Sequence, residues 1–87
     1  MADVWIPRAV QGLTDGQARV HVTGSTVGQI IRSLEREFPG MKDALCDWDG
    51  IVPGVAVIVD GQATSMGLLE RVREDSEVHF LPAIGGG

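Results

Sequence analysis

The clearest pattern of apolar and polar positions in the chain lies in residues 26–38. Apolar side chains recur there at intervals of three and four residues, which places them on one stripe of an α-helix. The stripe consists of Val27, Ile30, Ile31, Leu34 and Phe38. Thr26 and Gln29 fit a capping box, in which the Thr hydroxyl accepts from the third helical N–H and the Gln side chain reaches back to the cap. Pro39 and Gly40 predict the end of this helix.

Two short segments near the start of the chain predict a β-hairpin. Residues 4–6 are extended in pattern and end at Pro7, and residues 18–22 alternate apolar and polar positions as a half-buried strand does. The connection between them contains Gly12, Asp15 and Gly16, which reach left-handed backbone conformations at low cost. We therefore expect a turn or bulge in this connection.

The second half of the chain predicts two longer strands. Residues 55–59 form an aliphatic run without polar alternation, and Asp60 with Gly61 gives a strong type I′ turn signal directly behind it. The run should therefore continue into a hairpin through residues 62–64. Residues 78–81 resume an extended pattern, and Pro82 ends it.

Short helical turns are expected in two places. One covers residues 41–48, with Leu45 and Trp48 lying over one end of the core, and residues 49–54 then form a loop. The other is suggested by Leu68, Leu69 and Val72. The resulting order of elements predicts an α+β domain of two layers, in which one main helix covers a mixed sheet. The last strand can take a central place beside the first.

Length and charge exclude several classes of protein. The 87 residues suffice for one small domain, and a chain of this size encloses little room for a deep substrate cavity. The formal net charge is −5 and the cations form no cluster, so neither nucleic acid nor an anionic membrane is an expected partner. A single cysteine and a start without a positively charged signal region favour a cytoplasmic protein.

Few side chains suggest chemistry of their own. Cys46 adjoins apolar residues and has no histidine near it in sequence, so a buried, inert thiol is expected. His21 and His79 fall on predicted strands without thiol or acidic residues at ligand spacing, so we expect surface histidines and no metal site. The serines lack the motif or spacing of a hydrolase triad.

The glycines at positions 85–87 follow the last strand almost directly. Glycine loses the most conformational freedom on ordering and adds no side chain to the core, so folding alone does not favour three of them. A narrow enzyme channel can close around such a backbone and reach the terminal carbonyl. The alternative is an end that is merely frayed or artificially extended.

The chain resembles the ThiS/MoaD-type sulfur carriers, which are ubiquitin-like β-grasp proteins. The resemblance runs through nearly the whole length and includes the first strand ending at Pro7, the helix start at Thr26, the sequence of residues 38–40 and the hairpin of residues 57–61. Its most specific part is the ending, a strand followed by Pro82 and a diglycine. The resemblance therefore implies a β-grasp (ubiquitin-like) fold with residues 1–84 as the domain and residues 85–87 as a flexible tail.

The resemblance also implies the chemistry. The Gly87 carboxylate would be adenylated by a ubiquitin-activating-like adenylyltransferase/sulfurtransferase that consumes ATP, and then converted to a thiocarboxylate that donates sulfur. The chain itself would be neither an enzyme nor the holder of a bound cofactor. The ending and the helix exit look most like the carriers of cysteine biosynthesis, whose acceptor is a pyridoxal-phosphate-dependent synthase. Gly85 stands where many members have a larger residue.

Three other functions remain open. The chain could be a molybdopterin synthase small subunit, which works with the large subunit, or a ubiquitin-like modifier conjugated to lysines. It could also be an adaptor domain whose glycines are incidental. In any of these, Val78 and Phe80 should lie in the core, which leaves Leu81, Pro82 and Ile84 as a candidate docking patch. Leu81 could instead pack under the end of the helix.

Overall fold

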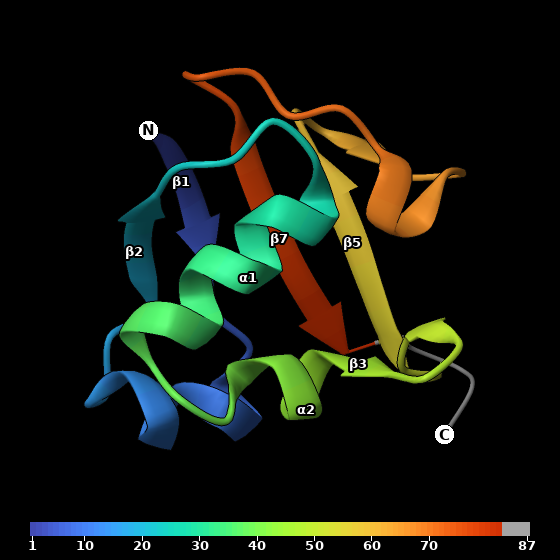
Figure 1. Cartoon of the computed structure of the whole chain (residues 1–87). Helices are drawn as coiled ribbons and strands as arrows, with labels where there is room; N and C mark the ends of the chain where they lie inside the picture. The colour runs from blue at the N-terminus through green and yellow to red at the C-terminus, as the bar shows by residue number, and fades with distance from the viewer. Residues whose placement is uncertain (83–87) are drawn as a thin grey trace.

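The computed structural model describes residues 1–82, and these form a mixed five-stranded sheet with one main helix across one of its faces (Figure 1). The strand order is β2-β1-β7-β5-β6. The strands are β1 (Ala2–Trp5), β2 (Arg19–Val22), β5 (Val55–Val59), β6 (Gln62–Ala63) and β7 (Glu77–Pro82). A separate two-stranded sheet consists of β3 (Cys46–Asp47) and β4 (Gly50–Ile51). The predicted α+β architecture is confirmed.

The last strand occupies the centre of the sheet, as predicted. Strand β7 runs parallel to β1, with Val4 opposite Val78, and antiparallel to β5, with Val57 opposite Phe80. The first hairpin is also confirmed, since β1 and β2 pair antiparallel with Val4 opposite Val20. The alternation in β2 is the predicted one, because its two valines are buried and its two polar residues are exposed.

Helix α1 (Val27–Glu37) begins and ends where the sequence predicts. The Thr26 hydroxyl accepts a hydrogen bond from the backbone N–H of Gln29 at 3.1 Å. The reciprocal bond differs from the prediction by one residue, because the Gln29 side chain accepts from the N–H of Ser25 rather than from that of Thr26. The side chain of Gln29 therefore also holds Ser25, the residue before the N-cap.

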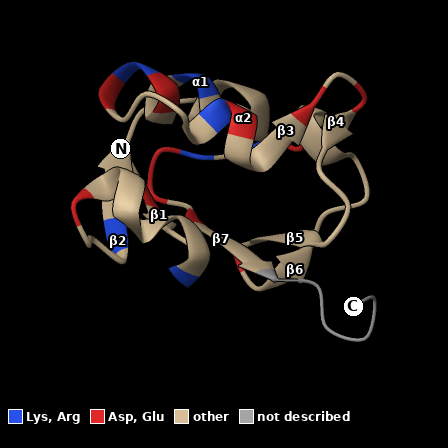
Figure 2. Ribbon diagram, turned by 90° about the horizontal axis from the view of Figure 1, so that it is seen from below, with Lys and Arg blue, Asp and Glu red and all other residues tan. Residues whose placement is uncertain are grey.

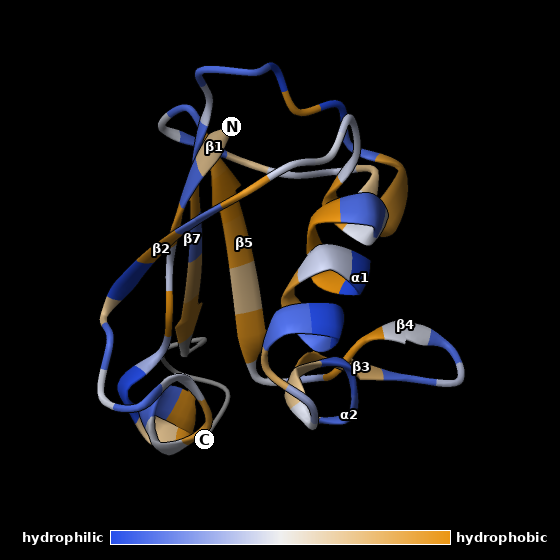
Figure 3. Cartoon of the chain, turned by 60° about the vertical axis from the view of Figure 1, so that its left-hand side comes forward, coloured by the Kyte–Doolittle hydropathy of each residue, from blue (hydrophilic) through white to orange (hydrophobic). Residues whose placement is uncertain are grey.

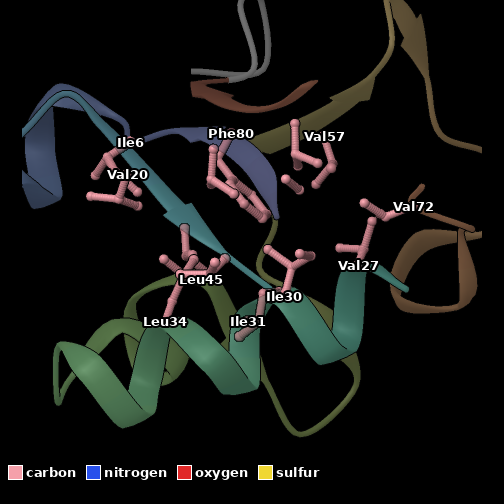
Figure 4. Close-up of a cluster of buried hydrophobic side chains, with 14 of the residues drawn as sticks. Ile6, Val20, Val27, Ile30, Ile31, Leu34, Leu45, Val57, Val72 and Phe80 are labelled. Carbon is pink, nitrogen blue, oxygen red and sulfur yellow. The ribbon is translucent and has the colours of Figure 1, made fainter. Parts of the chain in front are cut away.

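The core lies between α1 and the sheet. The apolar positions of α1 are turned toward the strands and its polar positions face outward (Figure 3). Figure 4 shows side chains from both layers pointing toward one another. The fully buried residues include Val4, Val27, Ile30, Leu34, Val78 and Phe80, each with no exposed surface. The prediction that Val78 and Phe80 are core residues is confirmed.

The turn between β5 and β6 forms as predicted. Asp60 and Gly61 both have positive φ, 50° and 85°, as a type I′ turn requires, and glycine adopts such values without steric cost. The Asp60 carboxylate also accepts hydrogen bonds from the Ser76 hydroxyl at 2.7 Å and from the backbone N–H of Glu77 at 2.9 Å. The turn is thus tied to the beginning of the central strand β7.

Two regions differ from the sequence prediction. The connection between β1 and β2 contains a 3₁₀ helix, η1 (Arg8–Thr14), before the predicted left-handed turn at Asp15 and Gly16. The expected turn at residues 68–72 is a shorter 3₁₀ helix, η2 (Gly67–Leu69), although Val72 is buried. Both elements are short enough that contacts with the rest of the molecule decide whether they form.

The region after α1 contains one clear error of prediction. Helix α2 (Met41–Leu45) is present and Leu45 is buried, but residues 46–51 form the β3–β4 hairpin instead of a helical end and a loop. Trp48 does not cover the core, since 96% of its surface is exposed. It lies at the tip of this hairpin, and the end of the core is closed by Met41 and Leu45.

None of the helices in the described residues is both long enough and apolar enough to span a lipid bilayer.

Candidate functional site

Strand β7 ends just before the residues that the sequence predicts to be reactive. Its last residue, Pro82, pairs with Val55 at the start of β5. Of the predicted site residues, Ile84, Gly85, Gly86 and Gly87 lie outside the residues that the structure describes, so their roles stay predictions, as does the domain boundary at residue 84. The described part ends at Pro82, the last residue of the central strand.

Leu81 faces solvent on the side of the sheet opposite to α1. It alternates along β7 with the buried Phe80, and 43% of its surface is exposed. The alternative, in which Leu81 packs under the end of the helix, is therefore wrong. Leu81 pairs with Ala56 of β5, so a small apolar neighbour lies beside it. The position suits a docking residue, whereas the role itself is not decided by exposure.

An aromatic stack lies on the same open face of the sheet. The rings of Trp5 and His79 are parallel within 7° and their centroids are 4.3 Å apart. The guanidinium of Arg19 lies 5.5 Å from the centroid of the Trp5 ring, a cation–π arrangement. The register explains the cluster, because Trp5 pairs with Arg19 on one side and with His79 on the other.

A second cross-strand group on this face brings a histidine against a carboxylate. His21 Nδ1 contacts the carboxylate of Asp3, its partner in the β1–β2 register. His79 Nε2 lies 3.9 Å from the carboxylate of Glu77 on its own strand. Both histidines are partly exposed, as expected, and each has an acidic neighbour, which for His21 depends on the strand register and for His79 stands two residues earlier on the same strand. Among residues 1–82, no three His, Cys, Asp or Glu side chains converge as metal ligands.

The polar and aromatic side chains of the open face form a unit that was not predicted from the sequence. The available signal was the alternation in β1, since Trp5 lies between the buried Val4 and Ile6 and must point the other way. Its neighbours could not be named without the strand register. The open face presents Asp3, Trp5, Arg19, His21, Glu77, His79 and Leu81.

Cys46 does not have the environment of a nucleophile. Burial raises the pKa of its thiol above the ordinary value, and the nearby Asp47 acts in the same direction, while Lys42 opposes them. The thiolate is the reactive form, so this thiol is poorly suited to nucleophilic chemistry near neutral pH. The residue is only partly buried, less than the sequence led us to expect.

Comparison with known sequences matches residues 4–87 to the ThiS family, so the match includes the last glycines as well as the folded part. The chain belongs to the ThiS family. In an alignment of 91 positions it is 32% identical to the sulfur carrier protein CysO of Mycobacterium tuberculosis (strain ATCC 25618 / H37Rv), and the alignment covers 97% of this chain and 96% of that protein. As a ThiS-family protein it is a small carrier rather than a catalyst.

Solved structures confirm the β-grasp fold. A chain of the Amycolatopsis orientalis BexX/CysO complex superposes with a TM-score of 0.91 at 28% identity, over 100% of both chains. The small archaeal modifier protein 1 of Methanosarcina acetivorans superposes with a TM-score of 0.79 over 99% of this chain and 95% of that protein. At 18% identity, the second likeness concerns the fold alone. The predicted resemblance to ubiquitin-like sulfur carriers is therefore confirmed.

Proposed function

We propose that this protein carries sulfur as a thiocarboxylate on Gly87 and donates it in the biosynthesis of cysteine. The observation that supports this most is the match to the ThiS family over residues 4–87, together with 32% identity to a sulfur carrier, CysO, across nearly both chains. The fold adds to it, because the strand that ends at Pro82 is the central strand of the sheet and is paired on both sides.

The carrier needs an activating partner because a carboxylate is a poor electrophile. A ubiquitin-activating-like enzyme would join a carboxylate oxygen of Gly87 to the α-phosphate of ATP, and pyrophosphate would leave. A sulfur nucleophile then attacks the Gly87 carbonyl carbon and displaces AMP, which leaves sulfur on the acyl group. The carrier supplies the acyl group and a docking surface, and contacts remote from the reacting carbon position it. The ATP site belongs to the partner.

The glycines of residues 85–87 suit this role sterically. They have no β-carbon, so an enzyme channel that fits a bare backbone can admit them and exclude larger residues. The acceptor proposed here is a pyridoxal-phosphate-dependent synthase that acts on an activated serine. The BexX/CysO complex, in which a carrier-type protein is bound to a second protein, supports recruitment of the carrier by a partner.

Intact-mass spectrometry tests the proposal directly. The full-length chain is incubated with the adenylating enzyme of the same organism, ATP, Mg²⁺ and a sulfide source. The expected product differs from the starting chain by replacement of one oxygen with sulfur, located at Gly87 by fragmentation. An unchanged mass under conditions in which that enzyme activates a known carrier would contradict the proposal.

Deletion of Gly87 separates the reaction from folding. The shortened chain should keep its thermal stability, because the core residues of the described part lie between Ala2 and Phe80. It should form no thiocarboxylate, because its end is one residue short of the reacting centre. Sulfur transfer by the shortened chain at the normal rate would show that the length of the tail is not important.

The same assays distinguish the other functions. Stable adducts with lysine side chains in cells would indicate a ubiquitin-like modifier, a class whose fold this chain shares. Sulfur transfer to a molybdopterin synthase large subunit, and none to a cysteine synthase, would indicate a molybdopterin synthase small subunit. Detection of the thiocarboxylate followed by new cysteine in the presence of the synthase is the result expected here.

A further inference from the structure

Trp48 is the most exposed large apolar side chain in the described residues. It lies at the tip of the β3–β4 hairpin with 96% of its surface open to water. Tryptophan is usually well buried in folded proteins, and at protein interfaces it is enriched among the residues that contribute most binding energy. Complete exposure of this side chain in an isolated carrier suggests that a partner covers it.

The hairpin holds Trp48 in a defined position. The strands pair with Cys46 opposite Ile51 and Asp47 opposite Gly50, and the backbone N–H of Asp49 donates to Asp47 Oδ1 at 2.8 Å. Gly50 has a φ of 126°, a value that residues other than glycine rarely adopt. Such a tip has less conformational freedom to lose on binding than an open loop would have.

The hairpin also lies at the end of the molecule where β7 ends. Only residues 52–54 separate β4 from Val55, and Val55 pairs with Pro82, the last residue of β7. Figures 1 and 3 show the hairpin at the same end of the molecule as the end of β7, but on the side of helices α1 and α2. An enzyme that takes the segment after Pro82 into its active site and covers this end of the molecule therefore also reaches Trp48.

The charges around Trp48 indicate the kind of surface that it meets. Asp47 and Asp49 are exposed and flank it in the sequence, and Figure 2 shows acidic residues on this hairpin. The whole chain has a net charge of −5. A pocket that accepts this tip needs an apolar floor for the indole ring and cationic side chains at its rim.

We propose that Trp48 anchors the carrier to the enzyme that activates its tail, by insertion into an apolar pocket bordered by Lys or Arg. The inference rests on the proposed function, since it assigns a second contact to the same partner. In this proposal Trp48 takes no part in the chemical step. Its contribution is to hold the carrier while the tail occupies the active site, so it should lower the dissociation constant without altering the chemical step.

Replacement of the ring tests the anchor. Trp48→Ala should weaken binding to the adenylating enzyme about 10-fold or more, measured by isothermal titration calorimetry. Trp48→Phe should retain part of the affinity. Met66→Ala is the matched control, because Met66 is also exposed (58%) but lies outside the hairpin. With saturating carrier, thiocarboxylate formation by Trp48→Ala should proceed at the wild-type rate, so that KM rises while kcat stays the same.

The acidic flank is tested by neutralisation without loss of the turn. The double variant Asp47→Asn, Asp49→Asn keeps an oxygen at position 47 to accept the N–H of residue 49. It should associate more slowly and depend less on salt concentration than the wild type. The control is Glu74→Gln, Asp75→Asn, which removes the same charge just before the start of β7, the end opposite to Pro82. Tighter binding of the hairpin variant would show that the rim is not cationic.

The outcomes separate this inference from the proposed function. If the wild type forms no thiocarboxylate, the proposed function fails. If the wild type forms the thiocarboxylate and Trp48→Ala binds the enzyme as tightly as Met66→Ala does, the proposal that Trp48 anchors the carrier is wrong. Sedimentation of the wild-type carrier alone provides a further check, because a dimer that Trp48→Ala converts to a monomer would show that a second copy covers the ring.

Discussion

Asp60 is the residue whose charge is most clearly used by the fold. The N–H of Glu77 and, to a smaller extent, the hydroxyl of Ser76 lower the pKa of its carboxyl below the ordinary value of 3.8. The unfolded chain therefore binds a proton more readily than the folded one, so folding is favoured by the ionised carboxylate. This contribution is complete above the ordinary pKa and is lost as the pH falls through the lower, folded value.

Asp60→Asn should remove that pH dependence. The amide can occupy the left-handed turn position, so the hairpin should form, but the free energy of unfolding at neutral pH should fall by up to ~1 kcal/mol, because solvent screens this exposed carboxylate. Urea denaturation of the wild type and the variant from pH 7 to pH 2 measures the free energy of unfolding at each pH. The difference between wild type and variant should shrink below about pH 4. A constant difference across this range would contradict the role of the charge.

At the residue scale, burial was easier to predict from the sequence than the contacts between side chains on different strands. Alternation in the strands correctly placed Val78 and Phe80 inside, whereas it left open whether Leu81 faces solvent or packs under the end of the helix. It could not show that Trp5 stacks on His79, because that contact depends on how two strands separated by most of the chain are aligned. The same limit hid the carboxylate beside His21.

At the scale of elements, the approach to helix α1 requires glycine at position 24. A β-carbon there would lie 2.8 Å from the backbone nitrogen of Ile30 and 3.0 Å from its Cδ1. The helix would have to shift, so Gly24→Ala should destabilise the protein by about 1–3 kcal/mol in chemical denaturation. Gly12→Ala is the control, because no atom lies within 4 Å of its added carbon. Equal stability of the two variants would show that the helix yields easily.

Elements with a long apolar pattern were predicted well, and short ones were not. Helix α1 has its own stripe and cap, and the turn at Asp60 and Gly61 has its own residue preference. The 3₁₀ helix η1 instead depends on contacts such as the Gln11 amide donating to the carbonyl of Ile6 and the buried hydroxyl of Thr14. Such side-chain hydrogen bonds to the backbone leave no periodicity in the sequence, and neither does the two-residue pairing of β3 with β4.

At the scale of the whole molecule, the arrangement separates what holds the fold from what meets a partner. Helix α1 covers one face of the sheet, while the other face and the end of β7 remain open (Figure 1). The topology could be predicted because the last strand must return beside the first in a sheet of this kind. The docking residues stay a prediction, since exposure is common to many surface positions.

Leu81 gives the sharpest test of the open end as a docking surface. Leu81→Ser should leave the free energy of unfolding within about 1 kcal/mol of the wild type, because the side chain is already 43% exposed. It should weaken binding to the adenylating enzyme about 10-fold if the partner covers the end of β7. Leu13→Ser is the matched control, since Leu13 has a similar exposure of 39% but lies on η1. Equal affinities of the two variants, measured by calorimetry, would place the docking surface elsewhere and leave the reaction at Gly87 unaffected.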